Sequence, residues 1–241
     1  MKIVIDAGHG PETPGKRSPD GSLREYQFNS VVARYMADEL LNGYEGVEIL
    51  MTHDDSRDVP LKERTDRANE WKADLFVSIH ANAAGDGARW NSAQGIETYV
   101  YETRPPAAVA LANAVQRQLV RSTGRPDRGV KYANFHVLRE TKMTAILVEC
   151  GFMTNREDAE LLKSDSYRRK CAEAIVAGIV ETYGLRKKQA AQVDAPDEVS
   201  SWAREAREWA VSRGITDGTR PKDPVTREEV WTMLYRMSFF V

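Results

Sequence analysis

Apolar residues in the first three quarters of the chain form two patterns: short continuous runs, and longer runs that recur every three or four residues. The short runs predict strands at residues 2–6, 47–52, 75–79, 95–101 and 145–148. The periodic runs predict helices at residues 25–40, 61–71, 107–120, 155–162 and 167–185. Residues 130–138 predict a loop or a short edge strand. Because strands and helices alternate, we expect an α/β domain with a largely parallel sheet.

The pattern changes after residue 185. Residues 186–200 are polar and contain Pro196, which predicts a linker between a main domain at 1–185 and a small helical module at 201–241. Thr226 and Glu229 have the spacing of a capping box at a helix start. Two short helices make a marginal core, so the module is expected to pair with a second copy, dock on the main domain or gain stability on a partner. The apolar residues 239–241 would be exposed unless they join such a contact.

Composition and charge exclude several function classes. The formal net charge is −2, so no overall basic field attracts nucleic acid or an anionic membrane. No apolar run approaches the roughly 18–20 residues of a membrane-spanning helix. The first residues lack a signal-peptide pattern, which predicts a protein made in the cytoplasm without a Sec route. Cys150 and Cys171 lack metal-type spacing and are expected to be reduced and buried.

Groups able to bind a metal or transfer a proton follow three of the predicted strands. His9 lies between Gly8 and Gly10 after the first strand, His80 follows the third, and Glu149 follows the last. Open α/β sheets place their ligand sites at the carboxyl ends of strands. The structural alternative for His9 is a hydrogen bond within its own loop.

Glu25 is a further candidate, in the first turn of a predicted helix, although the helix dipole alone favours a carboxylate there. The imidazoles of His9 and His80 with one carboxylate form the ligand set of a catalytic zinc ion, which leaves a position for water. Glu149 would take the proton of that water and pass it to a leaving amine. The sequence thus predicts three zinc ligands, His9, Glu25 and His80, and one catalytic carboxylate, Glu149.

Two other histidines, His53 and His136, are alternative metal ligands, but neither is flanked by the small residues that bring a loop close to a metal. The arginines at positions 57–67 are interpreted as a solvated helix face.

Three motifs carry a resemblance to a known family. They are IVIDAGHG at 3–10, FVSIHANA at 76–83 and LVECGFMTN at 147–155, with Glu25 between the first two. In this order, over about residues 1–183, they resemble the zinc-dependent N-acetylmuramoyl-L-alanine amidases of the Amidase_3 type.

The resemblance implies a single twisted sheet with helices on both faces. It implies one zinc ion bound at His9, Glu25 and His80, with Glu149 as the catalytic glutamate. It also implies hydrolysis of the amide between N-acetylmuramic acid and L-alanine in peptidoglycan, which causes cell-wall lysis. Asn82, next to His80, is a candidate for substrate binding.

The C-terminal module resembles one S-layer-homology repeat, a unit that usually occurs in threes and binds cell-wall polymers. The resembling segments are GITDGT at 214–219 and PVTREEV at 224–230. An amidase with a wall-binding module and no signal peptide is similar to a phage endolysin, which is made in the host cytoplasm and acts on the wall after release. Expected partners are peptidoglycan and a secondary wall polymer, with self-association through the module as a further option. The alternatives are a zinc peptidase or amidohydrolase acting on another amide, and a non-enzymatic wall-binding protein.

Overall fold

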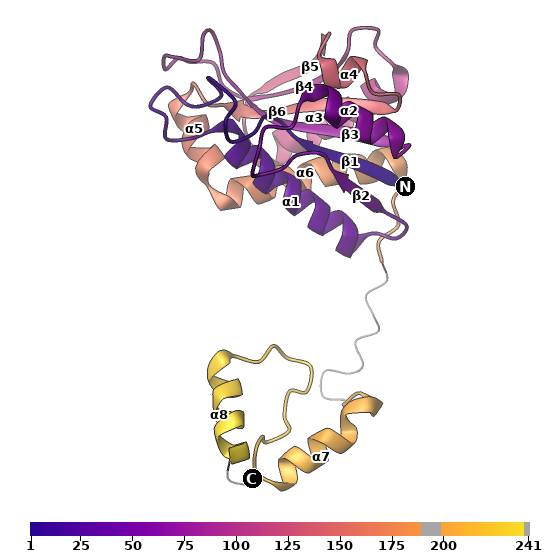
Figure 1. The fold of residues 1–241 in the computed structure, drawn as a ribbon, viewed down its shortest axis with the longest axis vertical. Helices are drawn as coiled ribbons and strands as arrows, with labels where there is room; N and C mark the ends of the chain where they lie inside the picture. Colours follow the sequence, from indigo (N-terminus) through magenta and orange to yellow (C-terminus); the bar gives the residue numbers. More distant parts are fainter. Residues whose placement is uncertain (189–198, 239–241) are drawn as a thin grey trace. The chain divides into compact units, whose positions relative to one another are not determined.

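A computed structural model describes residues 1–188 and 199–238 (Figure 1). Internal contacts divide the chain into two compact units, Met1–Lys188 and Gln189–Val241. Most of the expected linker, and the apolar residues 239–241, lie outside the described residues.

A six-stranded sheet forms the centre of the first unit, with strand order β2-β1-β3-β6-β4-β5. Neighbouring strands are parallel except β4 and β6, which are antiparallel. The predicted α/β fold with a mostly parallel sheet is therefore confirmed, and the segment after residue 126 forms an edge strand. The strands are β1 (Lys2–Ala7), β2 (Glu48–Met51), β3 (Leu75–Asn82), β4 (Ile96–Tyr101), β5 (Asp127–Ala133) and β6 (Thr144–Phe152).

Helices cover both faces of the sheet because its central strands are apolar on both sides. In β1, Ile3 and Ile5 face one layer and Val4 faces the other. The larger layer holds α1 (Glu25–Gly43), α3 (Pro106–Thr123) and α6 (Asp165–Tyr183), and the smaller holds α2 (Leu61–Glu70) and α4 (His136–Arg139) (Figure 1). Helix α5 (Arg156–Lys163) follows β6.

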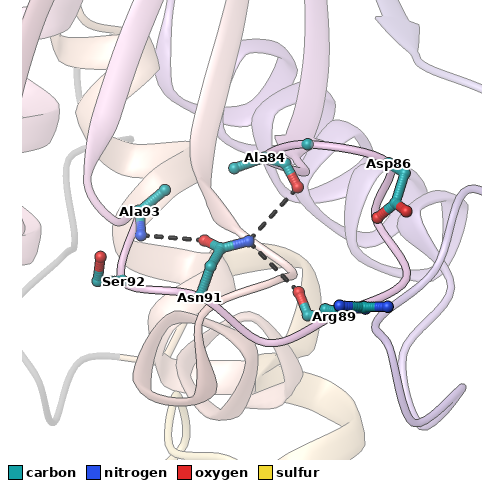
Figure 2. Close-up of a pocket in the computed structure, with 7 residues that line it drawn as sticks. Ala84, Asp86, Arg89, Asn91, Ser92 and Ala93 are labelled. Atoms are coloured by element: carbon teal, nitrogen blue, oxygen red, sulfur yellow. Dashed lines mark hydrogen bonds between the residues drawn. The ribbon is translucent and has the colours of Figure 1, made fainter.

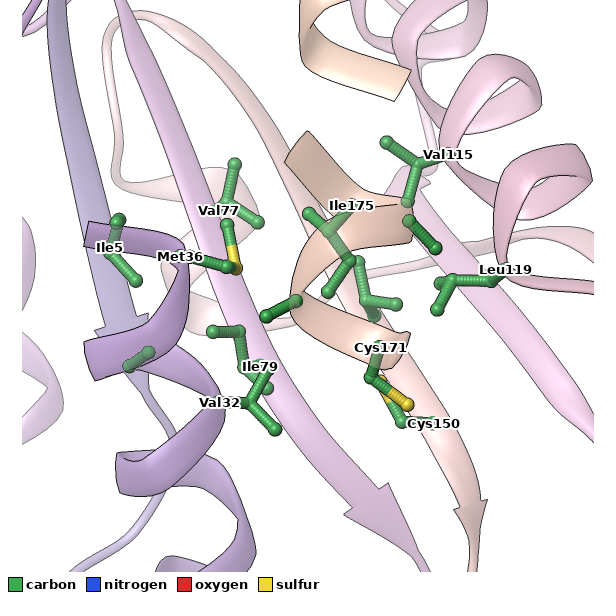
Figure 3. Close-up of a cluster of buried hydrophobic side chains, with 14 of the residues drawn as sticks. Ile5, Val32, Met36, Val77, Ile79, Val115, Leu119, Cys150, Cys171 and Ile175 are labelled. Carbon is green, nitrogen blue, oxygen red and sulfur yellow. The ribbon is translucent and has the colours of Figure 1, made fainter. Parts of the chain in front are cut away.

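The larger layer also contains both cysteines. Figure 3 shows Cys150 of β6 and Cys171 of α6 side by side among side chains such as Ile79 and Ile175. Both thiols are free and buried, as predicted.

The described residues of the second unit, 199–238, form three short helical segments, η1 (Ser201–Ala203), α7 (Arg204–Ser212) and α8 (Arg227–Met237). Thr226 caps α8, and the predicted capping box with Glu229 is present. Among the described hydrophobic residues of this unit only Ile215 is buried, while Trp202 is 86% exposed and Trp231 is 63% exposed. Across both units, no described helix combines the length and apolarity needed to cross a membrane.

Candidate metal centre

The carboxyl ends of β1, β3 and β6 lie side by side in the sheet. His80 on β3 is the register partner of Glu149 on β6, so their side chains project from the same face. His9 stands two residues beyond β1, in a loop whose Gly8 amide donates to the Ile79 carbonyl at 3.0 Å. The sheet thus brings together three groups that are distant in sequence.

Helix α1 adds Glu25 to the two histidines. The carboxylate lies 2.8 Å from His80 Nδ1 and 3.3 Å from His9 Nε2, using one oxygen for each. The two imidazole rings are perpendicular, with centroids 5.0 Å apart. One ligand atom from each of His9, Glu25 and His80 lies within 4.8 Å of the others, so the group could hold a metal ion.

Burial and mutual charge shift the pKa of each residue in this triad. Burial lowers the pKa of His9 to about 4, which favours the neutral, metal-binding imidazole. Burial opposes charge on His80 and Glu25 too, but their hydrogen bond and mutual attraction dominate. They raise the pKa of His80 and lower that of Glu25. In this arrangement a proton on His80 balances the Glu25 carboxylate, a role that a bound cation would take over.

Glu149 differs from Glu25 because one of its carboxylate oxygens has no hydrogen-bond partner among the described residues. Its Oε2 atom is buried and accepts no hydrogen bond from a described residue. Burial raises its pKa to about 8, His80 opposes the shift, and Glu25 reinforces it. A carboxyl group that titrates near neutral pH suits general acid–base catalysis.

Arg64 and Asp6 form a buried ion pair that the sequence does not predict. Arg64 of α2 is only 2% exposed, and its Nη1 donates to Asp6 Oδ1 of β1 at 2.8 Å. The interpretation of residues 57–67 as a solvated helix face is therefore wrong for Arg64. The burial of Asp6 accounts for this, because a carboxylate inside the sheet requires a paired cation.

Glu97 is a second missed residue, directly opposite Glu149 in the antiparallel β4–β6 pair. It is buried and forms ion pairs with Lys131 and Arg128 of β5. Asn82 donates to the same carboxylate at 3.0 Å. The structure thus places the Asn82 side chain against Glu97, and its substrate-binding role stays a prediction.

The two alternative histidines lie outside the triad. His136 lines the same cavity as His9 and His80, with its Nε2 atom 3.5 Å from the Thr65 hydroxyl. His53 lies 4.0 Å from the exposed Asp55 carboxylate. The group that could hold a metal, as far as the chain is described, contains neither of them.

A cavity of about 550 Å³ is lined by His9, His80 and Glu149. The apolar side chains along it come from the start of α2 and from the residues around α4, among them Leu61 and Phe135. A second, shallower pocket of about 430 Å³ is formed by residues 84–93, whose loop is closed by hydrogen bonds of Asn91 (Figure 2). It contains none of the residues predicted for the site.

Comparisons with known proteins identify relatives of this chain. Residues 3–181 match the family described as N-acetylmuramoyl-L-alanine amidase. The N-acetylmuramoyl-L-alanine amidase CwlM of Bacillus licheniformis is 37% identical, over 79% of this chain and 72% of that protein. An endolysin of Bacillus phage SPP1 is 33% identical, over 77% of this chain and 67% of that protein. The solved catalytic domain of the N-acetylmuramoyl-L-alanine amidase CwlV, from Bacillus (Paenibacillus) polymyxa var. colistinus, is 34% identical with a TM-score of 0.71. That match covers 77% of this chain and 99% of that domain.

Proposed function

Because this chain belongs to the N-acetylmuramoyl-L-alanine amidase family, we propose that it hydrolyses the amide between N-acetylmuramic acid and L-alanine in peptidoglycan with one zinc ion. His9, Glu25 and His80 would hold the metal, since two imidazoles and a carboxylate within 4.8 Å of one another are a common catalytic zinc set. Bound zinc supplies Lewis-acid polarisation of the scissile carbonyl and a water that ionises near neutral pH.

The observation that carries the mechanism is the unpaired oxygen of Glu149. This atom is free to accept the proton of the attacking water. The raised pKa favours this uptake, and the departing amine of L-alanine, which is a stronger base than the carboxylate, then takes the proton from Glu149. Neither step requires a second titratable group.

The proposal is tested with metal analysis and purified cell walls. We expect one zinc per chain, release of free L-alanine amino termini, and loss of both lysis and release with a chelator. Glu149→Ala is expected to keep zinc and wall binding and to lose lysis. Cleavage of soluble peptides with intact walls would indicate a peptidase acting on another amide. Lysis by Glu149→Ala at the parent rate would contradict the catalytic assignment.

The second unit is proposed to bind a secondary wall polymer, as its resemblance to an S-layer-homology repeat implies. Its exposed side chains, Trp202 and Trp231 among them, provide apolar contact area for such a polymer. Removal of all residues after Lys188 is expected to abolish sedimentation with walls while hydrolysis of soluble muropeptides continues. Unchanged sedimentation would contradict the proposal that the second unit binds the wall.

The resemblance to phage endolysins supports a lytic role, in which the protein is made in the host cytoplasm and reaches the wall after release. A relative of that description, the SPP1 endolysin, is 33% identical. Expression inside a bacterial host is expected to leave cells intact until the membrane is permeabilised, and lysis without permeabilisation would contradict this proposal.

A further inference from the structure

We infer that Asp6, Arg64 and Ser78 are positioning residues that fix the orientation of both histidines for the metal. The inference rests on the proposed function, because it concerns the zinc site named there. None of the three was singled out from the sequence, and none belongs to the ligand group. Hydrogen bonds lead from Asp6 outward to each histidine.

The first branch sets the tautomer of His80. Ser78 is fully buried, and its hydroxyl donates to Asp6 Oδ2 at 2.6 Å. A serine hydroxyl has one proton, so Ser78 Oγ can only accept from His80 Nε2, which lies 3.1 Å away. A metal at Nδ1 would replace the proton that this nitrogen shares with Glu25, so the proton that remains on His80 is on Nε2. Its Nδ1 atom, which faces Glu25, is left as the metal-binding nitrogen.

The second branch holds the backbone of His9. This residue has φ of +62°, a left-handed backbone conformation that is unfavourable for residues other than glycine. Arg64 Nη2 donates to the His9 carbonyl at 2.8 Å, and the same guanidinium donates to the carbonyls of Ala7 and Val59. Two of the four hydrogen bonds of this planar group, those to the Ala7 and His9 carbonyls, thus fix the turn that aims His9 at Glu25.

Asp6 joins the two branches. Its Oδ1 atom accepts from Arg64, its Oδ2 atom accepts from Ser78, and the Thr52 hydroxyl adds a third bond to Oδ1 at 2.5 Å. Both histidines are therefore positioned from one buried carboxylate. Thr52 touches Asp6 but neither histidine, which makes it the natural control.

The test compares Ser78→Ala with Thr52→Val. Both replacements delete one hydroxyl that donates to Asp6, and both sites are fully buried. Zinc affinity of the full chain is measured by competition with a chelator. Ser78→Ala is expected to weaken zinc binding about tenfold to a hundredfold, the range for a lost hydrogen bond behind a metal ligand. Thr52→Val is expected to stay within about twofold of the parent.

A spectroscopic readout separates positioning from general destabilisation. The ¹⁵N NMR signals of the zinc-loaded chain are expected to show His80 protonated at Nε2 in the parent and in Thr52→Val. Ser78→Ala is expected to lose this proton's protection from solvent exchange. Arg64→Lys keeps the positive charge opposite Asp6 but loses the guanidinium hydrogen bonds to three backbone carbonyls. It is expected to lower zinc affinity at least about tenfold.

The outcomes distinguish this inference from the proposed function. If the parent chain binds no zinc, the proposed function is wrong and this inference fails with it. If the parent binds zinc and Ser78→Ala binds it equally well, the positioning role alone is overturned. An equal loss in Thr52→Val would also overturn it, since that residue has no contact with either histidine.

Discussion

The site has two halves that differ in how their buried polar groups are paired. The ligand half, which we define as His9, Glu25, His80 and the Asp6–Arg64 pair, is densely hydrogen-bonded. The Glu149 half, defined as Glu149 and its strand β6, presents a buried carboxylate oxygen without a partner.

The roles proposed for the two halves account for this difference. Metal ligands bind best when their orientation is fixed before the ion arrives, so hydrogen bonds to each of them are an advantage. A general base must exchange a proton with water and substrate, and an internal partner would compete for the same oxygen. Beside the paired carboxylate of Glu25, the unpaired buried oxygen of Glu149 fits the proposed general base.

The largest expected effect comes from disturbing the ligand half at Gly8. A Cβ atom at Gly8 would overlap the imidazole ring of His80. Gly8→Ala should therefore push that ring away from Glu25 and reduce zinc affinity more than about a hundredfold, above the usual effect of a residue behind a ligand. Hydrolysis would be lost with the metal.

Gly43→Ala is the matched control for this substitution, because a Cβ atom there meets no other atom within 4 Å. Chelator competition and wall lysis should both be unchanged in Gly43→Ala. Parent-like zinc binding by Gly8→Ala would show that the ligand half tolerates movement and would remove the contrast between the halves.

The next effect is in the Glu149 half, where activity and stability should change in opposite directions. Glu149→Gln removes the base and should lower kcat about 10²–10⁴-fold, while zinc binding is kept. The same change removes a buried carboxylate whose pKa is raised to about 8. In the metal-free chain at pH 8 the variant should therefore be the more stable one, by a few kcal/mol as an order of magnitude.

The pH dependence gives the sign of this effect. The Glu149 pKa is 4.5 as its ordinary value and about 8 in the folded chain. Between these values the folded state binds the extra proton, so metal-free parent protein loses stability as pH rises from about 5 to 8. The difference between parent and Glu149→Gln in urea unfolding isolates this one group. Glu140→Gln is the control, since the pKa of Glu140 is lowered by Arg139 and does not change ionisation in that range.

The two halves also differ in how far the sequence predicts them. A histidine or glutamate that stands at or just beyond the end of an apolar run is visible as a strand end, and this pattern predicts His9, His80 and Glu149. The sequence does not distinguish the buried Arg64 from its exposed neighbours, because polar residues fill every turn of α2. The one available signal is Asp6, a carboxylate within a continuously buried strand, which therefore requires a cation.

Glu97 was missed for a related reason. Its alternation with Ile96 and Thr98 suggests a solvated face, as in a one-sided sheet. The structure buries both faces, so Glu97 is enclosed with Lys131 and Arg128. Alternation in a single strand indicates two faces and does not indicate what covers each of them.

The smallest effect tests the backbone that carries Glu149. The Tyr167 hydroxyl of α6 is buried and donates to the Cys150 carbonyl, one residue after Glu149, at 2.7 Å. Tyr167→Phe leaves that carbonyl without this donor, which should cost about 1–2 kcal/mol of unfolding free energy. For a unit of this size the loss corresponds to a Tm lower by roughly 2–8 °C. Tyr35→Phe, which removes a hydroxyl bonded to Asp165 at the exposed surface, should change Tm by less.

Because Tyr167 touches no ligand residue, zinc affinity should stay at the parent value while kcat falls only a few-fold. A tenfold loss of zinc affinity in Tyr167→Phe would show that the Glu149 half and the ligand half are structurally coupled. The division of the site into two halves would then be wrong.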